Sequence, residues 1–387
     1  MFQKLIFILP LYLLSILSQN LGYAQVNRLN FRSIGIDQGL NQPFPYSIIH
    51  SKNGYLWIAG ENGLWKYDGS TFKNYMHDPE DSSSLIYDFI WVLFEDSGGN
   101  IWAGSYGGGL SKYDPIFDCF KNYSYDKNAD NSISDNYIRS IDEDSEGNIW
   151  IGTNNGLNKL NPTTGLFKCY FVDDGLNSNV VRNILVSKDK KRLFIGTGNG
   201  LNFYDFEKEK LSAFQPTSSK NNQLSHHFIY ELHEYPKGTL WIGTGKGLNK
   251  LDLESSEMTY YFNSSDPSSI SNDVVFHILP LPSNEKEMLL GTMNGLNIFN
   301  IEKEKSERIL SKKHDPKSLR GDNIYALALG TDNSIWVGVN NEGLFQHHPQ
   351  FSKFNSLELV KETDDKYYKR VTSILQHSDD IYLFCTY

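Results

Sequence analysis

The chain has 387 residues, of which 14% are aromatic and 31 are glycine, and its formal net charge is −10 with a sequence pI near 5.5. Lys and Arg are scattered and form no basic stripe, so we expect neither nucleic acid nor an anionic lipid surface as a partner. Abundant aromatic residues and glycines, with little helical patterning, favour many short strands joined by tight turns.

The N-terminal segment has the features of an export signal. Lys4 precedes an apolar run from Leu5 to Leu17, and small residues follow at Gly22 and Ala24. The run is shorter than the roughly 20 apolar residues of a spanning helix, so we expect cleavage after Ala24. We interpret residues 1–24 as a signal peptide and expect a periplasmic protein. No later run is long enough to span a membrane, so no membrane contact by this chain itself is expected.

One motif, Trp-Ile-Gly-Thr-x-x-Gly-Leu, dominates the rest of the chain and recurs seven times at intervals of 44 to 48 residues. Its first position is occupied by Trp57, Trp102, Trp150, Phe194, Trp241, Leu289 and Trp336. One unit reads as four strands, at residues 137–144, 149–153, 157–160 and 166–170, with glycine-containing turns between them. This period predicts an all-β fold, a seven-bladed β-propeller of four-stranded antiparallel blades over residues 25–350.

The conserved spacing also gives the repeat anchors structural roles. We expect the tryptophans to pack between blades, because an aromatic side chain contributes a large buried area there. The glycine two residues later is expected to let neighbouring sheets approach closely. These anchors are Trp57, Trp102, Trp150, Trp241 and Trp336.

Counting the strands predicts how the ring closes. The seven units contain eight outer-strand patterns, from residues 30–34 to residues 351–354, so one outer strand is surplus. We predict that Phe31 to Ile34 complete the blade of Trp336, which joins the chain ends and covers an open edge. Residues 372–384 resemble residues 46–58, so residues 351–387 are interpreted as the first strands of a second, truncated propeller.

Three further patterns are interpreted as structural. Cys119 and Cys169 occupy matching outer-strand positions whose edges should splay apart, which disfavours a disulfide. Acidic turns such as residues 143–147 lack the ligand spacing of a calcium loop and are interpreted as hairpin turns. The histidines at 226, 227, 233 and 277 are interpreted as surface or loop residues, so no metal and no cofactor are predicted.

The stretch from Asp144 to Leu160, Asp-Ser-Glu-Gly-Asn-Ile-Trp-Ile-Gly-Thr-Asn-Asn-Gly-Leu-Asn-Lys-Leu, resembles the two-component regulator propeller repeat. That repeat occurs in the sensor half of hybrid histidine kinases of Bacteroidetes, and the resemblance covers roughly residues 30 to 387. This chain departs from the repeat pattern at two positions, where Phe194 and Leu289 stand in place of Trp. The resemblance implies carbohydrate-type ligands, a kinase and a spanning helix in missing downstream sequence, tethering to the inner membrane, and a homodimer formed through downstream domains.

One aligned position at the start of each innermost strand holds an aromatic residue or an arginine in every unit. It lies 11 to 13 residues before the repeat anchor, and we name it the mouth column: Tyr46, Trp91, Arg139, Arg182, Tyr230, Phe276 and Tyr325. Aromatic faces stack on sugar rings and guanidinium groups bind carboxylate or sulfate, so the column is a candidate glycan site. The alternative is that these side chains only fill the channel wall and pack blade against blade.

Two functions remain open. The first is a non-catalytic, ligand-sensing propeller of a hybrid two-component system that binds an oligosaccharide or other small ligand. The second is a secreted propeller enzyme, such as a glycan or lactone lyase, because architecture does not decide function. The enzyme would need a clustered acid and base near the channel, and the sequence alone fixes no such pair.

Overall fold

The computed structural model describes residues 29–35, 39–41, 44–214, 223–282, 284–353, 371–378 and 381–386. Up to Phe351 they form one unit, and residues 352–387 belong to a second unit that is described by itself. The predicted signal peptide lies outside the described residues. Among the residues that are described, no helix has the length and hydropathy to cross a bilayer.

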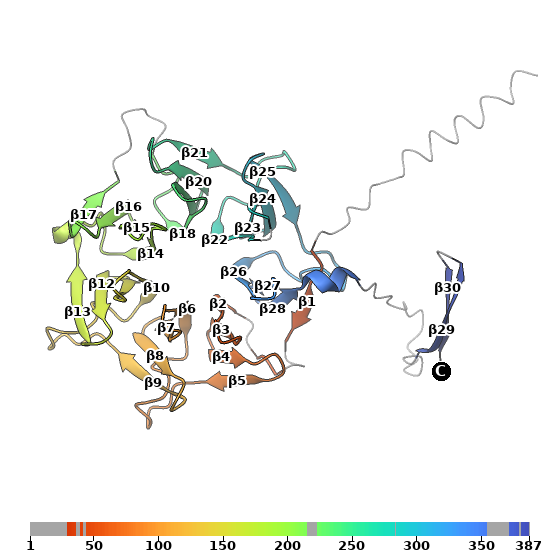
Figure 1. Cartoon of the computed structure of the whole chain (residues 1–387), viewed down its shortest axis with the longest axis horizontal. Coiled ribbons are helices and arrows are strands. Elements are labelled where there is room, and N and C mark those ends of the chain that lie inside the picture. Colours follow the sequence, from red (N-terminus) through yellow and green to blue (C-terminus); the bar gives the residue numbers. More distant parts are fainter. Residues whose placement is uncertain are drawn as a thin grey trace, which may run out of the picture. The chain divides into compact units, whose positions relative to one another are not determined.

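The first unit is a ring of seven four-stranded antiparallel sheets, as the repeat predicts (Figure 1). Blade 1 contains β2 (Ser47–His50), β3 (Leu56–Gly60), β4 (Gly63–Tyr67) and β5 (Phe72–Tyr75). Blade 2 contains β6 (Ile90–Glu95), β7 (Ile101–Ser105), β8 (Leu110–Asp114) and β9 (Cys119–Tyr123). Blade 3 contains β10 (Ile138–Glu143), β11 (Ile149–Thr153), β12 (Gly156–Asn161) and β13 (Leu166–Tyr170), and the short 3₁₀ helix η2 (Val172–Asp174) follows it.

The same order continues around the ring. Blade 4 contains β14 (Val181–Val186), β15 (Arg192–Thr197), β16 (Gly200–Asp205) and β17 (Lys210–Ala213). Blade 5 contains β18 (Ile229–Glu234), β19 (Thr239–Thr244), β20 (Gly247–Asp252) and β21 (Met258–Tyr261). Blade 6 contains β22 (Val275–Pro280), β23 (Glu287–Thr292), β24 (Gly295–Asn300) and β25 (Lys305–Ile309). Blade 7 contains β26 (Ile324–Leu329), β27 (Ile335–Val339) and β28 (Gly343–His347).

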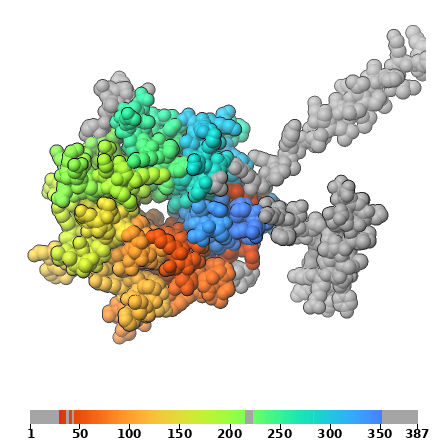
Figure 2. Space-filling model, in the orientation of Figure 1, coloured from red at the N-terminus to blue at the C-terminus, as the bar shows by residue number. Residues whose placement is uncertain are grey.

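The N-terminal strand closes the ring, which confirms the prediction from the strand count. β1 (Arg32–Ile34) pairs antiparallel with β28 as the outer strand of blade 7, with Ser33 opposite Phe345. In the space-filling view the red and blue ends of this unit meet at that blade (Figure 2). The outer-strand pattern at Phe351, which the strand count left as surplus, lies in the 3₁₀ helix η3 (Pro349–Lys353). β1 already occupies the edge of β28, and Pro349 has no N–H to donate to a strand ladder.

The repeat anchors are buried, and Trp150 contacts the neighbouring blade. Trp57, Trp102, Trp150 and Trp241 are at most 2% exposed. Trp150 lies with its ring centroid 4.9 Å from that of Tyr204 in the next blade. A Cβ added at Gly152 would come within 2.8 Å of Val181 Cγ1, so glycine is what lets blades 3 and 4 meet at this distance.

The acidic turns are hairpin turns with a second role. The Asp144 carboxylate accepts hydrogen bonds from the backbone N–H groups of Glu146 and Asn148, and from the Asn148 side chain. It also accepts a hydrogen bond of 2.8 Å from Nε1 of Trp150. Blade 2 repeats this arrangement with Asp96 and Trp102. The acidic residue therefore fixes both the turn and the polar edge of the buried indole.

Two cysteines of the ring lie on the predicted outer strands, Cys119 on β9 and Cys169 on β13. Neither thiol forms a disulfide.

The second unit contains one antiparallel hairpin, formed by β29 (Val371–Ser378) and β30 (Ile381–Thr386). The interpretation of this segment as the start of a second propeller stays a prediction.

Candidate functional site

The mouth column is built by a β-bulge repeated in the inner strands. In blade 3 Ile138 pairs with Thr153 and Ser140 with Gly152, which leaves Arg139 as the extra residue. A bulge redirects the side chain that it inserts. The same shift singles out one column residue in each of five more blades: Trp91, Arg182, Tyr230, Phe276 and Tyr325.

All seven column residues line one central cavity of about 930 Å³. Tyr46 directly precedes β2, where its backbone N–H donates to Ala59 O at 2.9 Å, and its hydroxyl donates to Glu61 at 2.8 Å. Burial and then this hydrogen bond raise the pKa of Tyr46 above its ordinary value, so the hydroxyl stays protonated at neutral pH. The structure thus brings together every residue that the sequence alignment selected.

Neighbouring column residues contact each other around most of the ring. Tyr46 stacks on Trp91 with ring centroids 4.9 Å apart, and Phe276 stacks on Tyr325 at 4.5 Å. Tyr230 meets Phe276 edge-on at 5.1 Å. These contacts cross from blade to blade, so the side chains pack against one another as well as line the cavity. Aromatic pairs of this kind contribute about 0.5–1.5 kcal/mol each beyond their buried area.

The two arginines occupy one arc of this ring, on the neighbouring inner strands β10 and β14. The Arg139 guanidinium lies 5.4 Å from the Trp91 ring and 4.9 Å from the Tyr106 ring, and its Nε donates to Asn154 Oδ1 at 2.8 Å. Arg182 lies 4.8 Å from the Phe228 ring. Burial, and then repulsion by Arg139, lower the pKa of Arg182 below its ordinary value. This arc is the positive part of the mouth.

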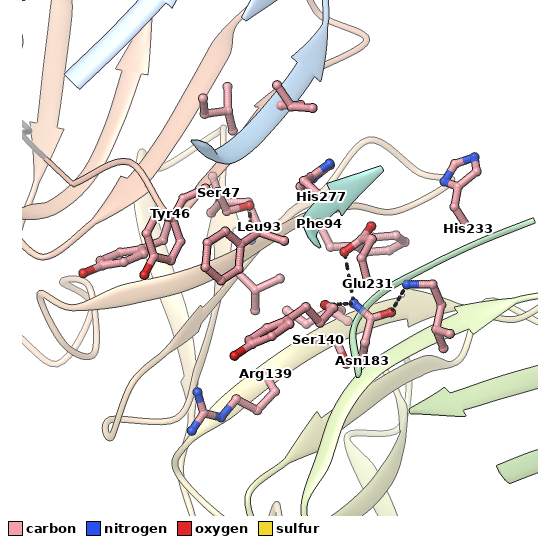
Figure 3. A pocket seen from close by; sticks show the side chains of 18 of the residues that line it. Tyr46, Ser47, Leu93, Phe94, Arg139, Ser140, Asn183, Glu231, His233 and His277 are labelled. Atoms are coloured by element: carbon pink, nitrogen blue, oxygen red, sulfur yellow. Dashed lines mark hydrogen bonds between the residues drawn. The ribbon is translucent and has the colours of Figure 1, made fainter. Parts of the chain in front are cut away.

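A second level of polar residues lies next along the inner strands, and the sequence analysis missed it. Ser140, Asn183, Glu231 and His277 line the cavity on blades 3 to 6 (Figure 3). The Asn183 amide donates to Glu231 Oε2 and to the Tyr230 carbonyl, both at 3.3 Å. Burial raises the pKa of Glu231 to about 8, although the bond from Asn183 opposes the shift. Glu231 is therefore a neutral acid at pH 7.

Two of the histidines are placed differently from the prediction. His233 and His277 lie on the inner strands β18 and β22 and line the cavity, so their interpretation as surface or loop residues was wrong. Burial lowers the pKa of each to about 4, so both are neutral at pH 7. His226 and His227 stack on each other at 4.4 Å in the loop before β18. No group of potential metal ligands occurs among the described residues.

Comparison with known proteins agrees with the fold and the repeat. Residues 84–107 and 132–155 match the two component regulator propeller family. A segment of 62 residues is 42% identical to "Histidine kinase P4" of Formosa agariphila, and it spans 16% of this chain and 4% of that protein. The chain thus covers only a small part of this relative.

Solved structures share the architecture. The extracellular domain of the hybrid two component system BT3049 from B. thetaiotaomicron superimposes with a TM-score of 0.72 at 23% identity, over 92% of this chain and 46% of that one. Virginiamycin B lyase from Staphylococcus aureus superimposes with a TM-score of 0.61 at 14% identity, over 83% of this chain and 99% of the lyase. At such identities the likeness shows the fold alone. The chain is thus a seven-bladed β-propeller, and two of its segments, residues 84–107 and 132–155, match the two component regulator propeller family.

Proposed function

We propose that this propeller is the extracytoplasmic ligand-sensing domain of a hybrid two-component system and that it binds an oligosaccharide in its channel mouth. The observation that carries the proposal is the convergence of all seven mouth-column residues on one cavity. Aromatic faces and guanidinium donors are the groups that bind sugar rings and their acidic substituents. The repeat family and the similarity to extracellular domains of two-component systems support the signalling context.

In this proposal the chain binds without chemical turnover, and kinase activity belongs to sequence outside it. The test is calorimetric titration of the purified propeller with a panel of oligosaccharides. Trp91→Ala and Arg139→Ala are expected to weaken binding by about 1.5–3 kcal/mol, which is more than tenfold in affinity. Tyr55→Ala and Arg192→Ala serve as controls, because both residues are exposed and do not line the cavity. Wild-type affinity in both column variants would assign the column to packing alone.

A second candidate function is supported by one specific feature. Glu231, with its pKa raised to about 8, and His277, with its pKa lowered to about 4, line the same cavity on neighbouring inner strands. A neutral acid and a neutral imidazole are the protonation states of a general acid and a general base at pH 7. The alternative is therefore a secreted lyase. Appearance of an unsaturated product from a bound glycan, lost in Glu231→Gln and His277→Gln, would favour it.

A further inference from the structure

The arginine pair lacks an acidic partner. Neither Arg139 nor Arg182 makes an ion pair with a carboxylate among the residues that the structure describes. Nε of Arg182 is buried and has no hydrogen-bond partner there. Two like charges on adjacent strands, partly removed from water, are costly unless an anion lies between them. The pair therefore has the charge and the free donors for an anionic group.

The surrounding rings hold both guanidinium groups in place. Cζ of Arg139 lies 5.4 Å from the Trp91 ring and 4.9 Å from the Tyr106 ring, and Cζ of Arg182 lies 4.8 Å from Phe228 and 5.4 Å from Tyr230. Ring faces attract cations and leave the N–H donors at the edge of a guanidinium to other partners; in Arg139 one of these donors, Nε, is bonded to Asn154. The donors are thus fixed in direction before a ligand arrives, which lowers the entropy cost of binding.

The polar level next to the pair also has unused hydrogen-bonding atoms. Ser140 Oγ and His277 Nδ1 are buried and without a partner in the described part of the chain. Asn183 and Glu231 lie between them along the ring of blades. Other parts of the same wall are apolar, with Val92, Leu327 and Leu329. A sugar ring has this same division between hydroxyl edges and an apolar face.

We infer that the ligand is an oligosaccharide with a terminal acidic sugar, whose anionic group binds between Arg139 and Arg182 while its hydroxyls meet Ser140, Asn183, Glu231 and His277. This inference rests on the proposed function and adds the charge and the orientation of the ligand. Glu95 and Asp142 also line the cavity, so a ligand with several negative charges is disfavoured there. The anion is a carboxylate or a sulfate ester, which present the same chemistry to a guanidinium pair.

The test uses three matched trisaccharides that end in galactose, in galacturonate or in 6-sulfated galactose, titrated calorimetrically into the whole chain. At least one acidic trisaccharide is expected to bind tenfold or more tightly than the neutral one, and the better acidic ligand distinguishes carboxylate from sulfate. Its affinity should fall with added salt, whereas the affinity of the neutral ligand should not.

Arg182→Gln is expected to abolish the preference for the acidic ligand, so that the acidic and neutral trisaccharides bind this variant with similar affinity. Arg182→Lys should retain part of the preference, which separates loss of charge from loss of fold. Arg192→Gln is the matched control, because Arg192 is an exposed arginine on β15 of the same blade. Ser140→Ala should weaken acidic and neutral ligands alike.

The outcomes separate this inference from the proposed function. Equal affinities for all three trisaccharides in the wild-type chain would overturn the acidic-ligand inference and leave the sensing proposal standing. An acidic preference that survives in Arg182→Gln and Arg139→Gln would overturn the assignment of the anion to the arginine pair. Binding of none of the three would count against the glycan-binding site itself.

Discussion

Nε1 of Trp150 donates a hydrogen bond of 2.8 Å to the carboxylate of Asp144, six residues earlier in the same blade. Asp144 is buried and holds the turn at the same time. Asp144→Ala is expected to destabilise the domain by about 2–4 kcal/mol, because it leaves an indole N–H and turn amides unsatisfied. Chemical denaturation would measure it. Asp332→Ala is the control. Asp332 lies in the turn before Trp336 but does not bind its indole, because Nε1 of Trp336 has no partner in the described residues. The loss of stability in this variant should stay below about 1 kcal/mol. Equal losses in both variants would contradict this role.

The indole itself contributes more than its hydrogen bond. Trp150 is fully buried and packs against Tyr170 of its own blade and Tyr204 of the next. Trp150→Ala should lower the free energy of unfolding by about 3–5 kcal/mol, the usual cost of removing a large buried aromatic side chain. A thermal midpoint equal to that of the wild-type chain would show that the repeat Trp does not hold the blades together.

The glycine of the motif should tolerate no side chain. A Cβ at Gly243 would lie 2.8 Å from the backbone carbonyl of Val275, which cannot move without shifting blade 6. We expect Gly243→Ala to destabilise by about 1–3 kcal/mol. Gly198→Ala is the matched control, because its Cβ would make only ordinary contacts, 3.4 Å or longer. Thermal denaturation of the two variants side by side tests whether blade spacing, rather than loss of glycine as such, is responsible.

Glu231 makes stability depend on pH. Its pKa is about 8 in the folded chain against 4.5 when unperturbed, so between these values the folded state holds one more proton than the unfolded state. The free energy of unfolding must then fall as pH rises through this window. Glu231→Gln should remove that decline and be the more stable protein at pH 8 by about 1–3 kcal/mol. The measurement is the free energy of unfolding of both proteins from pH 5 to pH 9. Parallel pH profiles for the two proteins would contradict the role of Glu231.

Ring closure can be tested by a cross-link. Arg32 on β1 lies opposite Gln346 on β28. The double variant Arg32→Cys, Gln346→Cys is expected to form a disulfide and to raise the free energy of unfolding by about 1–4 kcal/mol, because it closes a very long loop in the unfolded chain. Addition of reductant should cancel the gain, and each single variant should lack it. Failure of the pair to cross-link would contradict the β1–β28 pairing.

The repeat made the architecture predictable, because each turn glycine and buried anchor recurs at the same place and reports the same local structure. The mouth column can be recognised in the sequence by counting back from the anchors, because every blade has an aromatic residue or an arginine at that position. The polar level beside it cannot be recognised in this way, because its members share no residue type. They are Ser140, Asn183, Glu231 and His277. The bulge also breaks the alternation of the strand, so the facing of residues after Arg139 cannot be derived from simple period-two reasoning.

The outer-strand pattern at residue 351 is the one that the strand count left as surplus. A strand forms only where an unpaired edge is available, and β1 occupies the edge of β28. Such competition between two segments for one edge is a property of the assembled ring. Local sequence preference does not contain it.

The seam of blade 7 also sets the order in which the molecule can be completed. The backbone N–H of Asn30 donates to His347 across 317 positions of sequence, whereas the other blades are built from consecutive hairpins. β1 can therefore pair only once β28 is available, and we expect ring closure, as a non-local contact, to be the slow step of folding. At high concentration β28 can accept β1 from a second copy instead, so exchange of this one strand is the expected route to a domain-swapped dimer.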